Sequence, residues 1–222
     1  MTLLVFVTAA ILSYLIGSIP TGYLMAKARG IDIRAVGSGN IGATNVFRTL
    51  GKVPGVITLT VDCAKGAAAV LLVPRLVYHL FGILSVGGLP ILCVLFVILG
   101  HNYTCWLKFK GGKGIATSAG ALLALSPWTV LICLAVWLVV FGIGRYVSLA
   151  SIVAAIALPI AVYFTEHIGK DSETHGERHV LFYLSVVLCL LALWRHRSNI
   201  YRLINGTENR FTRKPKPGTP TS

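Results

Sequence analysis

Apolar runs close to membrane-spanning length recur along the 222-residue sequence, separated by short basic segments. A helix that crosses a bilayer needs about 20 predominantly apolar residues. Hydrophobic residues make up 55% of the chain and charged residues only 12%, whereas an ordinary soluble domain carries about 25% charged residues. This pattern excludes a soluble globular enzyme and a disordered chain. It predicts an all-α integral membrane protein.

We expect about seven transmembrane helices, near residues 3–25, 53–73, 83–104, 114–126, 128–144, 147–165 and 180–195. The run 114–126 is too short to cross a hydrocarbon core of about 30 Å at 1.5 Å per residue. It is either a half-helix or, together with the run after Pro127, one kinked element. The second option leaves fewer full crossings.

The distribution of basic residues predicts the orientation of these helices. The chain has 20 Lys and Arg against 7 Asp and Glu, and seven spans put 16 of the 20 on one side and 3 on the other, with Lys65 inside a span. Since cytoplasmic loops carry the excess of Lys and Arg, we expect the N-terminus outside and the C-terminus in the cytoplasm. No basic residue precedes the first apolar run, so we expect a retained span rather than a signal peptide.

The polar C-terminal stretch differs from the rest in composition. It holds three prolines and almost no apolar residues. We therefore expect a single transmembrane domain over residues 1–207 and a disordered cytoplasmic tail over residues 208–222.

The first inner loop, from Val36 to Lys52, is rich in glycine and in small hydrogen-bonding side chains. Glycine lets backbone N–H groups approach an anion, and arginine can bind a phosphate with two N–H groups. The alternative is a flexible connection with an inner-face charge. The density of donors favours a phosphate site formed by Ser38, Gly39, Asn40, Gly42, Thr44, Asn45 and Arg48.

The second inner loop, KFKGGKGIATSAG, combines lysine, glycine and the predicted start of a helix near Ile115. The free N–H groups of a helix N-terminus bind anions. We therefore predict an anion site at Gly111, Gly112, Lys113 and Gly114, with a plain basic juxtamembrane loop as the alternative. The loop lacks the Ser or Thr that follows lysine in a Walker A motif, so nucleotide hydrolysis is not indicated.

Two further inner segments carry candidate residues. The segment RYVSLAS contains Arg145 and Ser148, where an interfacial anchor of Arg145 and Tyr146 is an equally good interpretation. The segment RHRSNI places His196 and Asn199 three residues apart, on one face of a helix. His196 can move a proton near neutral pH.

Two ionisable residues, Asp62 and Lys65, lie within an apolar run, and we expect a local ion pair that supports the fold. His101 and Asn102 end another run, and we expect them to support the site from behind. The inner-face motifs carry almost no carboxylates, so neither a metal site nor another cofactor is expected. Nucleic-acid binding is not expected either, because a nucleic-acid binder lacks repeated spans.

Taken together, the segments place two or three anion-binding loops beside lipid. Such a setting indicates a substrate that has both a phosphate and an acyl chain. A transporter or flippase for a phosphorylated lipid or metabolite is the alternative. It is disfavoured because no internal repeat is evident and the polar motifs cluster on one face rather than at the midplane.

The motifs GSGNIGATNVFRTLG, GH, FKGGKG, RYVSLAS and HRSNI, in this order from the first span to about Phe211, resemble those of the bacterial acyl-phosphate:glycerol-3-phosphate acyltransferase family, PlsY. The resemblance implies a multi-pass enzyme of the bacterial inner membrane with its active site on the cytoplasmic face. It implies that a fatty acyl phosphate and glycerol 3-phosphate react to give 1-acyl-glycerol 3-phosphate and phosphate, an early step of phospholipid synthesis. The sequence carries no signal for oligomeric state or acyl-chain preference.

An acyl phosphate has a good leaving group, so positioning, charge neutralisation and one proton transfer suffice. We expect the glycerol hydroxyl to attack directly, with catalytic roles for Ser38, Arg48, Lys113, His196 and Asn199. The base is either His196 or an oxygen of a substrate phosphate. The sequence has no Gly-x-Ser-x-Gly elbow. It also has no Asp five residues after any histidine, a spacing found in acyltransferases that use acyl-CoA.

Overall fold

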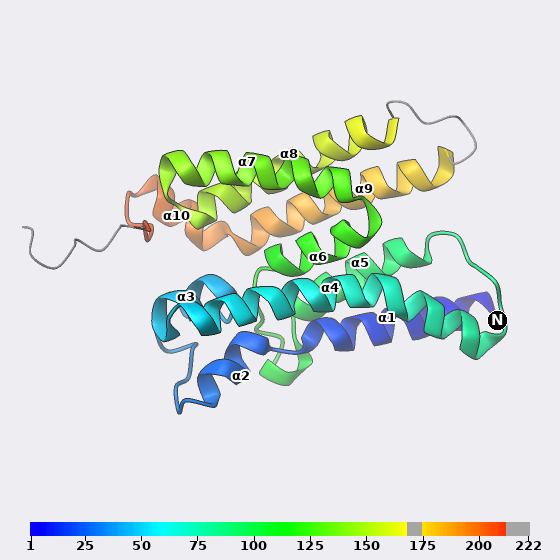
Figure 1. The fold of residues 1–222 in the computed structure, drawn as a ribbon, viewed down its shortest axis with the longest axis horizontal. Helices are drawn as coiled ribbons and strands as arrows, with labels where there is room; N and C mark the ends of the chain where they lie inside the picture. The colour runs from blue at the N-terminus through cyan, green and yellow to red at the C-terminus, as the bar shows by residue number, and fades with distance from the viewer. Residues whose placement is uncertain (168–174, 212–222) are drawn as a thin grey trace, which may run out of the picture.

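The computed structural model describes residues 1–167 and 175–211. Within these residues the chain forms α-helices and one 3-10 helix and contains no strand, which confirms the all-α prediction. The long helices run side by side along the longest axis of the molecule (Figure 1). The bounds are α1 Thr2–Ser18, α2 Thr21–Lys27, α3 Ala43–Leu50, α4 Lys52–Phe81, α5 Leu89–Asn102, η1 Cys105–Leu107, α6 Ile115–Leu125, α7 Pro127–Gly144, α8 Val147–His167, α9 His175–Arg195 and α10 Arg197–Ile204.

Five stretches are long and apolar enough to cross a membrane: Thr2–Lys27, Lys52–Phe81, Leu89–Leu107, Pro127–Gly144 and Val147–Thr165. The pair His179–Arg195 and Arg197–Ile204, bent by 59°, makes a sixth if it counts as one span. The protein is thus a multi-pass membrane protein. The expected count of seven and the expected orientation stay predictions.

The short run predicted at 114–126 forms a helix of its own. Helix α6 has 11 residues and so extends about 16 Å. Ser126 has a non-helical backbone conformation that separates α6 from α7. Pro127 occupies the first turn of α7, where no hydrogen bond within the helix requires its missing N–H. The result agrees with a half-helix rather than with a single kinked element.

Glycines bring the helices of the first half into close contact. A Cβ at Gly17 or Gly100 would overlap the backbone of α5 or α1, at Val97 and Tyr14. Gly66 and Gly120 serve the same purpose between α4 and α6. Small residues allow such close approach of helices within membranes, where packing rather than the hydrophobic effect drives association.

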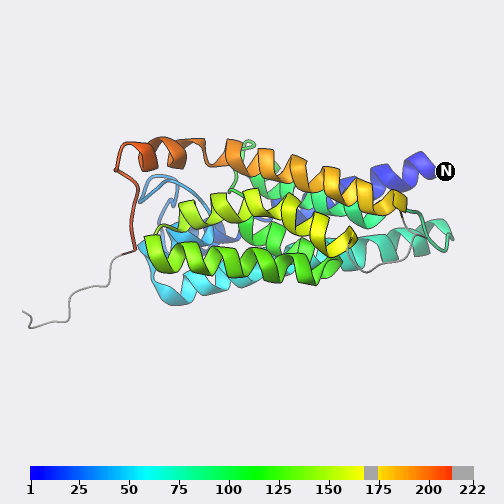
Figure 2. The ribbon, with the colours of Figure 1, turned by 90° about the horizontal axis from the view of Figure 1, so that it is seen from above.

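Helices α7, α8 and α9 form a second group beside the first (Figure 1). Helices α2, α3 and α10 lie at the end of the molecule opposite the N-terminus, and the view in Figure 2 agrees. The loop before α6 faces the same end. All four segments singled out in the sequence therefore meet at one end of the bundle, where the two groups of helices face each other.

Residues 208–211, which the sequence analysis assigned to the tail, are part of the described structure. The N–H of Phe211 donates to the carbonyl of Arg145 at 2.9 Å, and the Phe211 ring packs on Phe47 and Phe141. The packed region thus extends to Phe211 rather than ending at 207. Residues 212–222 and residues 168–174 of the expected outer loop 166–179 lie outside the described residues.

Candidate active site

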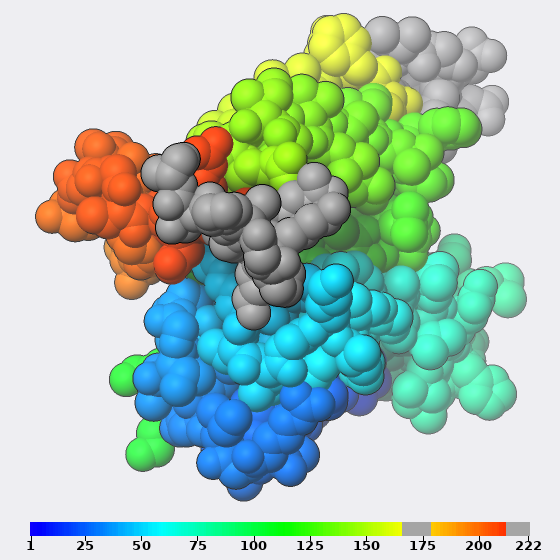
Figure 3. All heavy atoms as spheres, turned by 60° about the vertical axis from the view of Figure 1, so that its left-hand side comes forward, coloured from blue at the N-terminus to red at the C-terminus, as the bar shows by residue number. Residues whose placement is uncertain are grey.

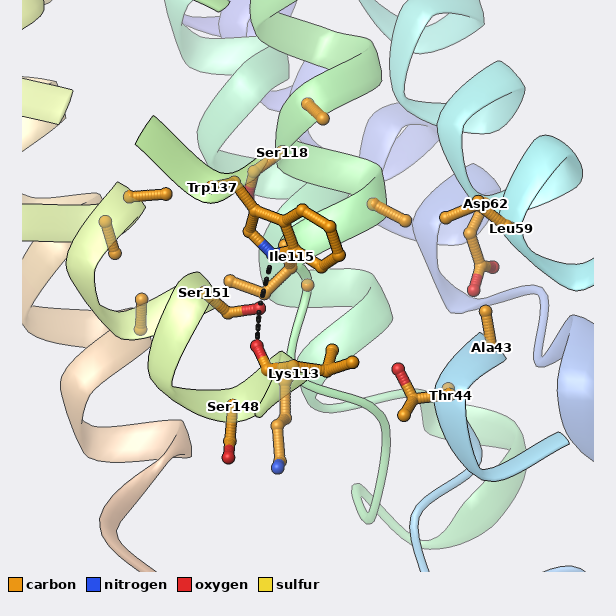
Figure 4. Close-up of a pocket in the computed structure, with 18 of the residues that line it drawn as sticks. Ala43, Thr44, Leu59, Asp62, Lys113, Ile115, Ser118, Trp137, Ser148 and Ser151 are labelled. Atoms are coloured by element: carbon orange, nitrogen blue, oxygen red, sulfur yellow. Dashed lines mark hydrogen bonds between the residues drawn. The ribbon is translucent and has the colours of Figure 1, made fainter. Parts of the chain in front are cut away.

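A cavity of about 560 Å³ lies between the two helix groups. Polar residues line its part near α3 and α10, and apolar residues of α6, α7 and α8 line the rest. Figure 4 shows Lys113 and Ser148 pointing to the same side, with Thr44 opposite and the indole of Trp137 beside Ile115. The site therefore has one end suited to anions and one suited to an acyl chain.

Most of the predicted site residues line this cavity. Those that do are Ser38, Asn40, Gly42, Thr44, Asn45, Arg48, Lys113, Gly114, Ser148, His196 and Asn199. Gly39, Gly111, Gly112 and Arg145 do not contribute to the lining. Arg145 instead offers its carbonyl to Phe211.

Asn45 holds the first loop in shape. Its side chain is 1% exposed, its amide donates to the carbonyls of Ile33, Val36 and Asn40, and its oxygen accepts the N–H of Ser38 at 2.9 Å. These bonds use the donors and acceptors of the side chain. Asn45 thus stabilises the conformation of the loop rather than binding a ligand. The residues of this segment that can contact a ligand are Ser38, Thr44 and Arg48.

In the second loop, the backbone N–H groups of Gly111 and Gly112 point toward α5 rather than toward the anion site predicted from the sequence. The N–H groups of Gly111 and Gly112 donate to the carbonyls of Asn102 and His101, at 3.1 and 3.0 Å, so they are not available to an anion. Gly114 and the first turn of α6, with Ile115 and Ala116, line the cavity. The first bond within this helix comes from Ser118 N–H, which leaves earlier N–H groups as an anion site.

Lys113 reaches across to the other helix group and donates a hydrogen bond to the side-chain oxygen of Asn199. Burial lowers the pKa of this lysine to about 8, and the positive charges of Arg202, Arg195 and Arg48 act in the same direction against the opposing effect of Glu208. Burial and the three arginines thus outweigh the single carboxylate of Glu208, and a bound phosphate would add the negative charge that favours the ammonium.

His196 is 2% exposed and lies where α9 bends into α10. Its Nδ1 is 2.8 Å from the carbonyl of Ala192. A carbonyl only accepts, so Nδ1 carries the hydrogen and Nε2 of the neutral ring has a free lone pair. This arrangement suits a proton acceptor.

Glu208 is a site residue that the sequence analysis missed. Its carboxylate accepts hydrogen bonds from Ser148 at 2.8 Å, Asn199 at 2.8 Å and Arg202 at 2.7 Å. Burial raises the pKa of Glu208, but these three bonds outweigh burial and hold it below its usual value. A single glutamate within the basic segment RLINGTENR was the only signal in the sequence.

Arg48 contacts the last described residues of the chain. It donates to the carbonyl of Asn209 at 3.0 Å, and its guanidinium lies 4.9 Å from the centre of the Phe211 ring. Figure 3 shows the orange and red C-terminal residues beside the blue and cyan part that contains α3. The C-terminal segment thus orients the arginine at the mouth of the cavity.

On the α4 side of the cavity, which Asp62 helps to line, the ion pair expected between Asp62 and Lys65 is present at 2.7 Å. Lys65 also donates to the carbonyl of Ile19 at 2.9 Å, and Thr21 donates to Asp62 at 3.3 Å. This network ties α4 to the break between α1 and α2. Among the described residues, no group of three or more His, Cys, Asp or Glu side chains is placed to hold a metal ion.

The family model described as glycerol-3-phosphate acyltransferase matches residues 7–206. The chain belongs to this acyltransferase family. The glycerol-3-phosphate acyltransferase of Desulforamulus reducens is 49% identical over 203 residues, covering 91% of this chain and 93% of its own. The Geobacter sulfurreducens protein of the same name is 46% identical over 199 residues, covering 90% and 94%.

Two solved structures of this acyltransferase family have the same fold. Crystal structures of PlsY, an integral membrane glycerol 3-phosphate acyltransferase, match with TM-scores of 0.77 for the glycerol 3-phosphate form and 0.76 for the lysophosphatidic acid form. Their sequences are 40% and 39% identical, and the matches cover 93% of this chain and 96% and 95% of theirs. The resemblance found in the motifs is confirmed, and the transporter alternative is not favoured.

Proposed function

We propose that this glycerol-3-phosphate acyltransferase takes its acyl group from a fatty acyl phosphate and releases inorganic phosphate. One observation carries the proposal: the cavity joins a cationic end, with Arg48 and Lys113, to an apolar end on α6, α7 and α8. Solved relatives are described as glycerol 3-phosphate and lysophosphatidic acid forms. A donor with a phosphate and an acyl chain fits the same two ends.

The reaction needs no acyl-enzyme. The primary hydroxyl oxygen of glycerol 3-phosphate attacks the acyl carbonyl carbon, and the bond from that carbon to the phosphate oxygen breaks. Arg48, Lys113 and the N-terminus of α6 hold phosphate groups and stabilise the leaving phosphate. The proton of the hydroxyl passes to Nε2 of His196 or to a phosphate oxygen. The products are 1-acyl-glycerol 3-phosphate and phosphate.

We further propose that the site faces the cytoplasm from the bacterial inner membrane. The excess of Lys and Arg at the end with α2, α3 and α10 supports this orientation. Both expected products suit that location, because phosphate leaves to water and the acylated product to the bilayer. Reaction of Lys110, which is exposed at this end, with an impermeant amine reagent in sealed inverted vesicles tests the orientation.

The deciding experiment supplies purified protein with radiolabelled glycerol 3-phosphate and either palmitoyl phosphate or palmitoyl-CoA. We expect lysophosphatidic acid from palmitoyl phosphate alone, with equimolar release of phosphate. Product from palmitoyl-CoA would show that the donor is a thioester. Folded protein that gives no product with either donor would contradict the function as a whole.

A further inference from the structure

Gly111 and Gly112, two glycines of the second inner loop that do not line the cavity, make contacts on two sides. On one side their N–H groups donate to the carbonyls of Asn102 and His101, at the end of α5. A Cβ on Gly112 would overlap the His101 ring, and a Cβ on Gly111 would overlap the His101 carbonyl. The loop backbone therefore approaches the end of α5 more closely than a residue with a Cβ would allow.

The other side of the same two peptide groups is bound by Arg195, the last residue of α9. Its guanidinium donates to the Gly111 carbonyl at 2.8 Å and to the Gly112 carbonyl at 3.0 and 2.6 Å. It also lies 5.1 Å from the centre of the Tyr103 ring. The planar fork thus binds both carbonyls at once, while the ring supports its face.

We propose that Arg195 is a positioning residue, which fixes the Gly111–Gly112 turn so that Lys113 and the start of α6 face the cavity. Arg195 does not line the cavity itself. It directly precedes His196, so the same contact also sets the distance between the phosphate-binding loop and the His196–Asn199 segment. The inference rests on the proposed function, since it assigns Lys113 to a phosphate.

Arg195 also acts on the charge of Lys113. The charged groups that influence Lys113 are Glu208, Arg202, Arg195 and Arg48, and Asn199 accepts its hydrogen bond. Since Arg195 contributes to the lowered pKa of Lys113, removing its charge raises that pKa. A lysine at position 195 keeps the charge but cannot bind two carbonyls in a fixed plane. The two effects are therefore separable.

The test uses the full-length protein with R195K, R195Q and the control R197Q. Arg197 is two positions away, carries the same charge, is exposed, donates to the Trp194 carbonyl and lies over the Trp194 ring. Two readouts are taken: kcat and KM for each substrate, and the pH dependence with which an amine reagent labels Lys113, followed by peptide mass spectrometry. The labelling needs no turnover, so it reports on Arg195 even if the proposed reaction is wrong.

We expect R195K to lower kcat/KM by roughly 10²-fold, as a displacement of about 1 Å does in other enzymes, while the labelling midpoint of Lys113 stays at the wild-type pH. R195Q is expected to lower kcat/KM at least as far and to move the midpoint to higher pH. R197Q stays within about twofold of wild type in both readouts. An R195K enzyme as active as R197Q, or an unchanged midpoint in R195Q, overturns the proposal.

A fourth variant, Y103L, covers the case in which the Arg195 variants do not fold. It removes the ring beneath the guanidinium and leaves every charge in place. We expect folded Y103L, judged by size-exclusion chromatography, to lower kcat/KM in the same direction as R195K and by a smaller factor. Wild-type kinetics in Y103L, with no folded Arg195 variant, would also overturn the proposal. An inactive wild-type protein would instead count against the proposed function.

Discussion

The ammonium of Lys113 donates a hydrogen bond to the side-chain oxygen of Asn199, 86 positions later in the chain. Lys113 precedes α6, in the first group of helices, and Asn199 belongs to α10, which follows the second group. The polar end of the cavity thus exists only where the two groups meet.

Replacing Lys113 by alanine removes a buried positive charge from the site. We expect kcat/KM to fall by about 10²–10³-fold, equivalent to roughly 3–4 kcal/mol of lost transition-state stabilisation, as for other lost electrostatic donors. Lys110→Ala is the control, because Lys110 is exposed and does not line the cavity. A loss of tenfold or less in Lys113→Ala would contradict a role in binding phosphate.

The pH dependence of the wild-type enzyme is expected to report on the same lysine. Burial lowers the pKa of Lys113 to about 8, so the ammonium that binds phosphate is present below pH 8 and is lost above it. We therefore expect kcat/KM to fall tenfold per pH unit above about 8. The substrate phosphate titrates near pH 6 and does not account for this limb. A profile that stays flat up to pH 10 is incompatible with a lysine in this environment.

His196→Ala separates the two candidate bases. If Nε2 of His196 takes the proton, kcat falls by about 10²–10⁴-fold. His79→Ala provides the control, since His79 is exposed near the far end of α4. Turnover within a few fold of wild type would leave the phosphate oxygen as the base. In that case His196 would act in orientation alone, visible in KM for glycerol 3-phosphate.

Glu208→Gln is expected to lower stability as well as activity. The amide cannot accept all three hydrogen bonds, which leaves a buried donor unpaired at a cost of about 1–3 kcal/mol. The control is Asp32→Asn, which removes an ion pair to Arg34 whose side chains are 46% and 43% exposed and so contributes little. The midpoint of thermal unfolding in detergent should drop in the first variant and hardly change in the second.

The same carboxylate predicts how stability depends on pH. The folded pKa of Glu208 lies below its usual value of about 4.5, so its stabilising effect is present above pH 4.5 and is lost as the pH falls through the folded pKa. Wild type should therefore lose part of its advantage over Glu208→Gln in acid. If the difference in stability between wild type and Glu208→Gln did not depend on pH down to pH 3, ionisation of Glu208 would not contribute to stability.

The far end of the cavity is expected to limit acyl-chain length. Helix directions put Leu122, Val130 and Leu158 farthest from the polar end. Val130→Phe fills this space, so shorter acyl phosphates should gain over longer ones by at least about tenfold in relative kcat/KM. Leu131→Phe makes a similar change on the exposed side of α7. An unchanged chain-length profile in Val130→Phe would place the chain elsewhere.

Most of the fold was predictable because apolar runs and basic loops reflect the bilayer directly. The count of spans stays a prediction, because α6 has only 11 residues and the last apolar helix is bent by 59° against α10. Local composition also does not reveal amide direction, so Gly111 and Gly112 were expected to donate to an anion and instead donate to α5. Glu208 was missed because its place in the site depends on a hydrogen bond from Ser148, 60 positions away in the sequence.

The placement of Glu208 and Asn209 after the last helices has a consequence for biosynthesis. Arg48 and Lys113 are synthesised in the first half or near the middle of the chain, but their partners Asn209 and Asn199 are synthesised near its end. A nascent chain with only α1 to α8 inserted has much of the apolar cavity and none of the groups from His196 to Glu208. Because the proposed reaction uses these groups, we expect a chain that ends before His196 to be inactive rather than partly active.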